Sequence, residues 1–228
     1  MTLKSIISPS VLASDFGKLT FECSRMIKDG ADWLHMDIMD GHFVPNITMG
    51  APILTCVKQA IPDIFMDCHM MVADPERWVS DVAAAGGKLY TFHYEATKDH
   101  IKIIKQIHDA GMKAGIAISP DTPAEVITKE IADAADMILV MTVHPGKGGQ
   151  KFMAECLPKV TTLRELYPNK DIQVDGGVGP ATIHVCADAG SNVIVAGSAI
   201  FGAKDSKDVI NQIRAAVDEA IAKRASKA

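Results

Sequence analysis

The sequence lacks a surplus of positive charge. Its formal net charge is −5, its isoelectric point lies near 5.9, and no block of like charges extends along the chain. Proteins that bind nucleic acid or anionic membranes usually present a basic patch. We therefore expect neither a nucleic-acid nor a membrane partner, whereas a small and even an anionic ligand is compatible with this composition.

Paired cysteines, a leader peptide and long hydrophobic runs are also missing. The five cysteines are scattered and never spaced as C-x-x-C, so the sequence indicates neither a disulfide framework nor a zinc ribbon. No charged region followed by an apolar stretch opens the chain, and no run approaches the length of a membrane span. We expect a soluble, cytoplasmic protein. The terminal Ser226-Lys227-Ala228 resembles the Ser-Lys-Leu signal, which makes peroxisomal import a minor second hypothesis.

The sequence does contain a series of short apolar runs. With 48% hydrophobic residues, 228 positions suffice for one sizeable core, so we expect a single domain over residues 1–228 whose last few residues form a basic tail. Eight runs have the length of strands. In chain order they are SIISPSVL, DWLHMDIM, IFMDCHMMV, LYTFHYEA, KAGIAIS, MILVMTV, DIQVDGG and NVIVAGSAI.

Segments with helical spacing of apolar residues separate these runs. Three proline pairs predict helix starts, because proline is tolerated in the first helical turn. These pairs are Asp74-Pro75, Thr122-Pro123 and Gly179-Pro180. Four glycines predict helix ends, because glycine readily adopts the left-handed conformation that closes a helix. These glycines are Gly30, Gly86, Gly111 and Gly190.

This alternation predicts an α/β protein with parallel strands joined by right-handed crossovers. About eight strand–helix units favour a single (β/α)8 TIM barrel, and an open doubly wound sheet is the alternative. In both architectures ligands bind beyond the carboxyl ends of the strands. The polar residues at those ends are therefore the candidate site residues.

Imidazole and carboxylate groups alternate along the predicted strands. His35 and Asp37 share one face of the second strand, Asp67 and His69 share a face of the third, and Asp175 ends the seventh. Unpaired carboxylates inside a barrel are costly, so these groups must bond to one another or bind a cation. A lone strand histidine is usually a core residue, but two strands with His and Asp in matching register favour a metal site.

The remaining histidines receive weaker interpretations. His93, close to Glu95, is interpreted as a residue that supports a metal ligand or packs the core. The others fall in predicted loops or helices and are assigned no chemistry: His42, His100, His108, His144 and His184.

Methionines and glycines mark the same strand ends. Met39, Met71 and Met141 fall near the carboxyl ends of three strands, where methionine either fills the core or lines a pocket without supplying protons. Glycine-rich stretches follow the last three strands as HPGKGGQ, DGG and AGS. Backbone N–H groups in such loops bind anions, and barrels often hold phosphate beside their last two strands. We expect a phosphate-bearing ligand.

Together these features fit chemistry next to a carbonyl group in a small phosphorylated sugar. A divalent metal would act as a Lewis acid and stabilise an enediolate while one carboxylate removes the α-proton. A second carboxylate on the opposite face would return the proton and invert the carbon, which is an epimerisation.

Five motifs, in this order, resemble those of the ribulose-phosphate 3-epimerase family. They are SPSVLASDF, HMDIMDGHFVPN, DCHMMV, VMTVHPGKGGQKF and VDGGVGP, and the resemblance spans nearly the whole chain. It implies a (β/α)8 barrel that interconverts D-ribulose 5-phosphate and D-xylulose 5-phosphate in the pentose phosphate pathway.

The resemblance also implies roles for individual residues. The metal would be held by His35, Asp37, His69 and Asp175, with Asp37 and Asp175 doubling as the acid/base pair. Substrate contacts are implied for Ser10, His69, Met39, Met71, Met141, Gly146, Lys147, Gly148, Gly149, Gly176, Gly177, Gly197 and Ser198. Asp67 and Asp40 are not implied as ligands. Lys147 departs from the family pattern, in which many members carry Phe, and this leaves the closing contact of that loop in doubt.

Several alternatives stay open at this point. A ketohexose 6-phosphate is a second candidate substrate, and a metal-dependent aldolase or decarboxylase would use the same Lewis acid. A class-I aldolase is disfavoured, because no lysine projects from within a strand. A non-catalytic sugar-phosphate-binding protein is the least favoured reading. The metal is expected to be one Zn²⁺ or Fe²⁺ per subunit, with Mn²⁺ or Co²⁺ as alternatives, and a homo-oligomer is expected on general grounds.

Overall fold

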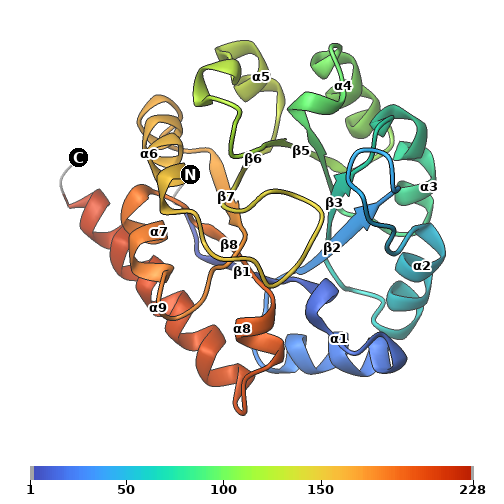
Figure 1. Cartoon of the computed structure of the whole chain (residues 1–228), viewed down its shortest axis with the longest axis horizontal. Coiled ribbons are helices and arrows are strands. Elements are labelled where there is room, and N and C mark those ends of the chain that lie inside the picture. The colour runs from blue at the N-terminus through green and yellow to red at the C-terminus, as the bar shows by residue number, and fades with distance from the viewer. Residues whose placement is uncertain (1–2, 227–228) are drawn as a thin grey trace.

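The computed structural model describes residues 3–226, which form a closed barrel of eight parallel strands surrounded by helices (Figure 1). The strands are β1 (Ile6–Pro9), β2 (Leu34–Met39), β3 (Met66–Met71), β4 (Leu89–His93), β5 (Lys113–Ile118), β6 (Met137–Met141), β7 (Asp171–Asp175) and β8 (Val193–Ala196). Hydrogen-bonded neighbours follow the order β1-β8-β7-β6-β5-β4-β3-β2.

The sheet closes between its first two strands. Ser10 forms a parallel bridge with His35, and the Trp33 N–H donates to the Ile7 carbonyl. The expected (β/α)8 barrel is therefore confirmed, and the open doubly wound sheet is excluded. Because both faces of each strand are covered, β6 and β8 are continuous apolar runs, whereas β2 and β3 carry buried polar residues on their inward face.

The connections between strands contain nine α-helices and six short 3-10 helices among residues 3–226. The α-helices are α1 (Leu19–Lys28), α2 (Ala51–Ala60), α3 (Val79–Ala84), α4 (His100–Asp109), α5 (Lys129–Ala134), α6 (Leu157–Leu166), α7 (Ile183–Ala189), α8 (Ser198–Phe201) and α9 (Ser206–Ala225). The 3-10 helices are η1 (Val11–Ala13), η2 (Phe16–Lys18), η3 (Pro75–Trp78), η4 (Tyr94–Ala96), η5 (Ala124–Val126) and η6 (Ala154–Cys156).

The predicted helix ends are confirmed. Of the predicted starts, Asp74-Pro75 opens the 3-10 helix η3 and Pro123 directly precedes η5, whereas no helix starts at Pro180. Gly30, Gly86, Gly111 and Gly190 follow α1, α3, α4 and α7 with φ values of 104°, 98°, 82° and 121°. After the three proline pairs, the α-helices begin only at Val79, Lys129 and Ile183.

The late starts have local causes. The hydroxyl of Thr122 donates to Glu95 rather than capping a helix, and Thr128 provides the cap of α5 instead. After β7, the hydroxyl of Thr182 accepts the N–H of Gly179 and closes a turn before α7. The side chains of Thr122 and Thr182 therefore form other hydrogen bonds, and the α-helices begin further along the chain than the prolines predicted.

Two apolar regions surround a polar layer. The larger lies between the strands and the helices, and a smaller cluster of Trp33, Leu89, Met137 and Val193 fills the barrel interior at the amino-terminal ends of the strands. Next along the interior come side chains that are polar yet fully buried, namely Ser8, His35, Asp67, Thr91 and Gln173. A polar layer under the carboxyl ends of the strands marks that end as the place of the site.

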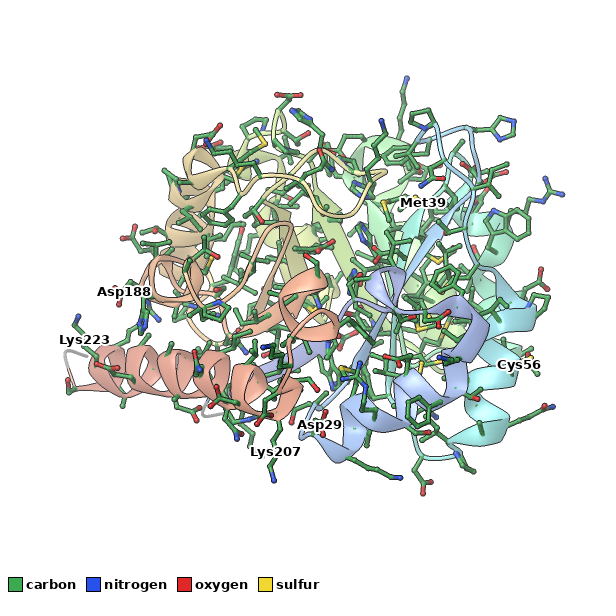
Figure 2. All side chains as sticks on the ribbon, turned by 60° about the horizontal axis from the view of Figure 1, so that its bottom comes forward. Asp29, Met39, Cys56, Asp188, Lys207 and Lys223 are labelled. Atoms are coloured by element: carbon green, nitrogen blue, oxygen red, sulfur yellow. The ribbon has the colours of Figure 1, made fainter. Side chains whose placement is uncertain are left out.

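Charged side chains project from the outer helices, and the cysteines of the chain are unpaired. Figure 2 shows Lys207 and Lys223 projecting outward from α9 and Cys56 from α2, while Met39 lies at one end of the barrel. All five cysteines are free thiols, four of them buried. Among residues 3–226 no helix has the length and apolarity to cross a membrane. Residues 227 and 228 of the terminal tripeptide lie outside the described part of the chain.

Candidate active site

Four ligand-type side chains meet inside the carboxyl-terminal mouth of the barrel. His35 and Asp37 come from β2, His69 from β3, and Asp175 is the last residue of β7. His35 and Asp37 are both inward-facing because they are two residues apart on one strand, and the register pairs Asp37 with His69 on the neighbouring strand. The structure therefore brings together the set that the resemblance implied.

The distances between the donor atoms fit a single small cation. His35 Nε2 lies 3.2 Å from His69 Nδ1, 3.4 Å from an oxygen of Asp37 and 3.6 Å from an oxygen of Asp175. His69 Nδ1 lies 3.1 Å and 3.6 Å from the same two oxygens, and all four atoms are within 4.8 Å of one another. Four ligands about 2.0–2.1 Å from a tetrahedral ion would be spaced by about 3.3–3.4 Å. The observed spacing straddles that value.

The charges of the site favour a cation at this point. Burial alone would lower the pKa of His35, but the carboxylates of Asp67 and Asp37 outweigh burial and raise it well above its usual value. Burial would raise the pKa of Asp37, but contacts with His35 and His69 hold it below its usual range. Asp37 is therefore ionised, and positive charge among these groups is stabilised.

His35 is held by two further buried side chains. Its Nδ1 lies 2.7 Å from an oxygen of Asp67, and that oxygen also accepts a hydrogen bond of 2.6 Å from the amide of Gln173. In the neutral ring that would bind a metal ion, an acceptor at Nδ1 places the proton there and leaves the lone pair of Nε2 facing the other three candidate ligand atoms. Asp67 thus supports a candidate ligand without belonging to the cluster.

His69 is held through a longer chain of contacts. Its Nε2 lies 2.9 Å from Nε2 of His93, whose Nδ1 is 3.2 Å from an oxygen of Glu95. Burial lowers the pKa of His93 to about 4, while hydrogen bonds from His93, Thr122 and Ser119 overcome burial and lower the pKa of Glu95 to about 2. At neutral pH His93 is a neutral imidazole beside an ionised carboxylate.

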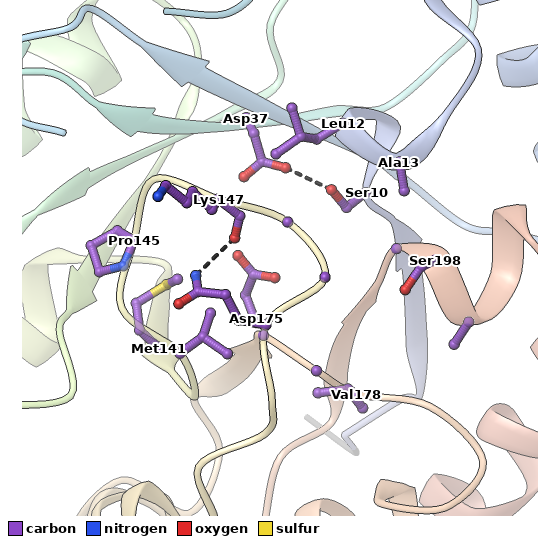
Figure 3. A pocket seen from close by; sticks show the side chains of 18 of the residues that line it. Ser10, Leu12, Ala13, Asp37, Met141, Pro145, Lys147, Asp175, Val178 and Ser198 are labelled. Atoms are coloured by element: carbon purple, nitrogen blue, oxygen red, sulfur yellow. Dashed lines mark hydrogen bonds between the residues drawn. The ribbon is translucent and has the colours of Figure 1, made fainter. Parts of the chain in front are cut away.

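A pocket of about 440 Å³ opens above the cluster (Figure 3). The carboxyl groups of Asp37 and Asp175 reach it from opposite sides and point toward its centre. Ser10 lines the pocket and its hydroxyl donates to Asp37 over 2.6 Å. His35 and His69 are fully buried and do not line it, so the structure places His69 below the pocket rather than on its wall.

Methionines and glycines form much of the remaining wall. Met39, Met71 and Met141 are each almost fully buried and line the pocket, which agrees with the pocket-lining reading of these residues. The glycines and the adjacent serine implied as substrate contacts also line it: Gly146, Gly148, Gly149, Gly176, Gly177, Gly197 and Ser198.

The backbone at Gly177 leaves no room for a side chain. Gly177 has φ of 67°, and a Cβ atom there would lie 2.7 Å from the backbone nitrogen of Phe152. Within residues 3–226, the N–H groups of Gly148, Gly149 and Gly177 have no hydrogen-bond acceptor. Free N–H groups on the wall of a pocket are suited to bind the oxygens of an anion.

Lys147 occupies the loop after β6. Its side chain is exposed, and it is the one lysine or arginine among the pocket-lining residues of the described chain. The amide of Gln150 donates to the carbonyl groups of His144 and Lys147 over 2.6 and 2.8 Å, which braces the loop from within.

Several residues of the site received no role from the sequence. Gln173, which holds Asp67, and the pocket-lining Val178 and Thr182 were not singled out, and His144 was assigned no chemistry. Gln173 carries one usable signal, because it precedes Asp175 by two positions and therefore shares its face of β7. Asp40 is no ligand: it accepts N–H groups of His42, Phe43 and Ala73 and shapes the loop after β2.

Comparison with known proteins identifies the family. The sequence model of the Ribulose-phosphate 3 epimerase family matches residues 6–201. The chain belongs to this family. A relative in Candida glabrata named ribulose-phosphate 3-epimerase is 53% identical over 224 residues, covering 92% of this chain and 91% of the relative. The cytoplasmic isoform of the enzyme in Oryza sativa is 49% identical, covering 93% and 94%.

Solved structures add the fold at lower identity. The 3-hexulose-6-phosphate synthase of Salmonella typhimurium superimposes with a TM-score of 0.71 at 17% identity, covering 94% of this chain and 99% of the other. This likeness shows a shared barrel. The cytoplasmic location, the alternative of peroxisomal import and the homo-oligomeric state stay predictions.

Proposed function

We propose that this chain is a ribulose-phosphate 3-epimerase that inverts C3 of D-ribulose 5-phosphate to give D-xylulose 5-phosphate. One observation carries the proposal: Asp37 and Asp175 reach the same pocket from opposite sides, directly above a compact set of nitrogen and oxygen donors. Membership of the epimerase family supports the reaction class, and the wall of free backbone N–H groups supports a phosphorylated substrate.

The donor set supports one divalent metal ion per chain, held by His35, Asp37, His69 and Asp175. Two imidazoles and two carboxylates at the observed spacing suit Zn²⁺ or Fe²⁺ first, with Mn²⁺ and Co²⁺ as alternatives. When bound, such an ion supplies Lewis-acid polarisation of the substrate carbonyl.

The proton steps belong to the two aspartates. In one direction Asp37 accepts the proton from C3, and Asp175 delivers a proton to the same carbon from the other face. In the reverse direction the roles exchange. The hydroxyl of Ser10 hydrogen-bonds one oxygen of Asp37 and fixes the orientation of the carboxylate, so that its other oxygen faces the cluster.

The remaining wall divides into two functions. Met39, Met71 and Met141 exclude water from the planar enediolate without offering a competing proton donor. The backbone of Gly146, Gly148, Gly149, Gly176, Gly177, Gly197 and Ser198, with the side chain of Lys147, would bind the phosphate group. The phosphate therefore orients the sugar so that C3 lies between the two carboxyl groups.

The deciding experiment is turnover of D-ribulose 5-phosphate in deuterated water by the metal-analysed protein and by Asp175→Asn. Deuterium at C3 of D-xylulose 5-phosphate, together with a folded but inactive variant, is the expected result. Turnover retained by the variant would remove Asp175 from the mechanism. Products of carbon–carbon cleavage would indicate a lyase, and reaction only with a ketohexose 6-phosphate would reassign the substrate.

A further inference from the structure

The two histidines of the proposed metal site are supported in different ways. His35 contacts the carboxylate of Asp67 directly, inside the barrel. On the side away from the donor set, Nε2 of His69 contacts another imidazole, His93, whose Nδ1 in turn contacts the carboxylate of Glu95. The contact between His69 and His93 leaves the proton position open, because either of the two facing Nε2 atoms can carry the shared proton.

The position of that proton decides whether His69 can be a ligand. If His93 carries it on Nε2, then the proton of a neutral His69 resides on Nδ1, the atom that faces Asp37 at 3.1 Å and belongs to the donor set. If His69 carries it on Nε2, the Nδ1 lone pair is free to bind a cation, and His93 must hold its own proton on Nδ1.

Glu95 selects between these two arrangements. A carboxylate accepts hydrogen bonds and cannot donate, so its oxygen 3.2 Å from His93 Nδ1 requires a proton on that atom. The hydroxyl of Ser119 is 3.5 Å from the same nitrogen and is the more distant partner. We propose that Glu95 is a positioning residue which, through His93, sets the tautomer of His69 that binds the metal ion.

The surrounding residues hold Glu95 in place for this role. Its second oxygen accepts the N–H of Ser119 over 2.8 Å and the hydroxyl of Thr122. The ammonium group of Lys159, from α6, donates to the carbonyl groups of Ser119, Pro120 and Thr122 over 2.8, 3.0 and 3.1 Å. The loop of residues 119–122, which positions the carboxylate, is thus held by a side chain of α6.

His93 is equally constrained. It is fully buried, with its ring stacked on His69 at 5.0 Å between centroids and tilted against Phe43 at 4.8 Å. A fully buried ring in contact with two other rings cannot rotate to exchange its nitrogens without disturbing its neighbours. Glu95 therefore acts by fixing which nitrogen of His93 carries the proton, and not by moving the His93 ring.

This inference rests on the metal site proposed above, and its test measures metal affinity rather than turnover. The full chain is stripped of metal, and Co²⁺ binding is titrated against a chromophoric chelator for the wild type and Glu95→Gln. The amide has the same shape but can donate as well as accept, so it no longer selects a tautomer. We expect affinity to fall by about tenfold or more.

Two further variants separate selection from simple support of the loop. Thr122→Val removes one support of Glu95 but keeps the carboxylate that selects the tautomer, so Co²⁺ affinity should fall clearly less than in Glu95→Gln. His93→Phe weakens binding by itself and removes the intermediary, so adding Glu95→Gln to it should change affinity by less than about twofold. Thermal unfolding without metal checks that each variant is folded.

Ring ¹⁵N shifts give a readout that a structural role would not move. In the metal-free chain at pH 8, Asp37 competes for the His69 proton at Nδ1, so both tautomers should be present in the wild type. The share protonated on Nε2 should fall in Glu95→Gln. Wild-type affinity in Glu95→Gln, an equal further loss in the His93→Phe background, or an unchanged tautomer would each overturn the inference. A chain that binds Co²⁺ as predicted but does not epimerise would overturn the proposed function and leave this inference standing.

Discussion

The mouth of the barrel is built in two chemically different halves. On β2 and β3, side chains supply the functional groups. His35, Asp37 and His69 project inward from regular strands and are almost completely buried. After β6, β7 and β8, the wall is mainly backbone exposed at glycines, four of which have positive φ: Gly146, Gly149, Gly176 and Gly177. The first half suits a cation and proton transfer, and the second suits an anion, because carboxylates and N–H groups carry opposite polarity.

Asp175 joins the two halves, and its removal should have the largest effect. Asp175→Asn preserves the shape of the side chain but cannot exchange a proton with C3 at neutral pH, so we expect kcat to fall by about 10³-fold or more. The check is the isotope experiment with D-ribulose 5-phosphate. The matched control is Asp171→Asn at the opposite end of β7, which should leave the rate within a few-fold of the wild type. Equal losses in both variants would indicate a structural effect.

Removal of metal tests the cationic half by itself. Treatment with a chelator should abolish turnover and lower the melting temperature by about 5 °C or more relative to protein with a hundredfold excess of Zn²⁺ over Kd. Added Zn²⁺ or Fe²⁺ should reverse both changes. In His35→Gln, which lacks one donor, the melting temperature should no longer respond to the chelator. A response of the same size in that variant would place the ion elsewhere.

Gly177→Ala tests the anionic half. Both this change and Gly111→Ala place a Cβ at positive φ, which costs about 1–2 kcal/mol of stability, but only at Gly177 does the new atom meet backbone, that of Phe152. We expect KM for the sugar phosphate to rise about tenfold for Gly177→Ala and to stay unchanged for Gly111→Ala. Inhibition by inorganic phosphate should weaken in parallel with KM. A shared KM effect would mean that lost stability, not the phosphate wall, is being measured.

Lys147→Met should give the smallest change. An exposed ammonium group on the pocket wall attracts a phosphate through a screened interaction, so KM should rise about threefold at low ionic strength and match the wild type at about 1 M salt. Lys151→Met is the matched control: Lys151 lies four residues after Lys147 and does not line the pocket, so this change should leave KM unchanged. A fall in kcat with KM unchanged would instead assign Lys147 to loop closure.

The two halves were not equally accessible from the sequence. Alternation along a strand is a local property, so the common inward face of His35 and Asp37 followed from their spacing, and the repeated His/Asp pattern of β3 followed in the same way. The eight strands were likewise recognised from local runs of apolar residues, and their number predicted the barrel. The start of α5 was predicted less well, because the hydroxyl of Thr122 donates to Glu95 of η4, a contact that only the tertiary structure forms.

The supports of the metal site lay beyond local pattern. Asp67 and Gln173 are 106 residues apart, and the contact between their side chains exists only because β3 and β7 face each other across the closed barrel. The chain from His69 through His93 to Glu95 likewise crosses between neighbouring strands. In the sequence, these supporting residues cannot be distinguished from other buried polar residues, because their partners are known only once the strands are arranged in the barrel.

What the sequence by itself determined was the inventory of the site: eight strands, the ligand-type residues on their inward faces, and glycines after the last strands. The tertiary structure decided the spacing of 3.1 to 3.6 Å among the donor atoms, the opposed directions of Asp37 and Asp175, and the partner of each buried histidine. The physical reason is that strand periodicity fixes the face on which a side chain lies, whereas closure of the barrel fixes which faces meet.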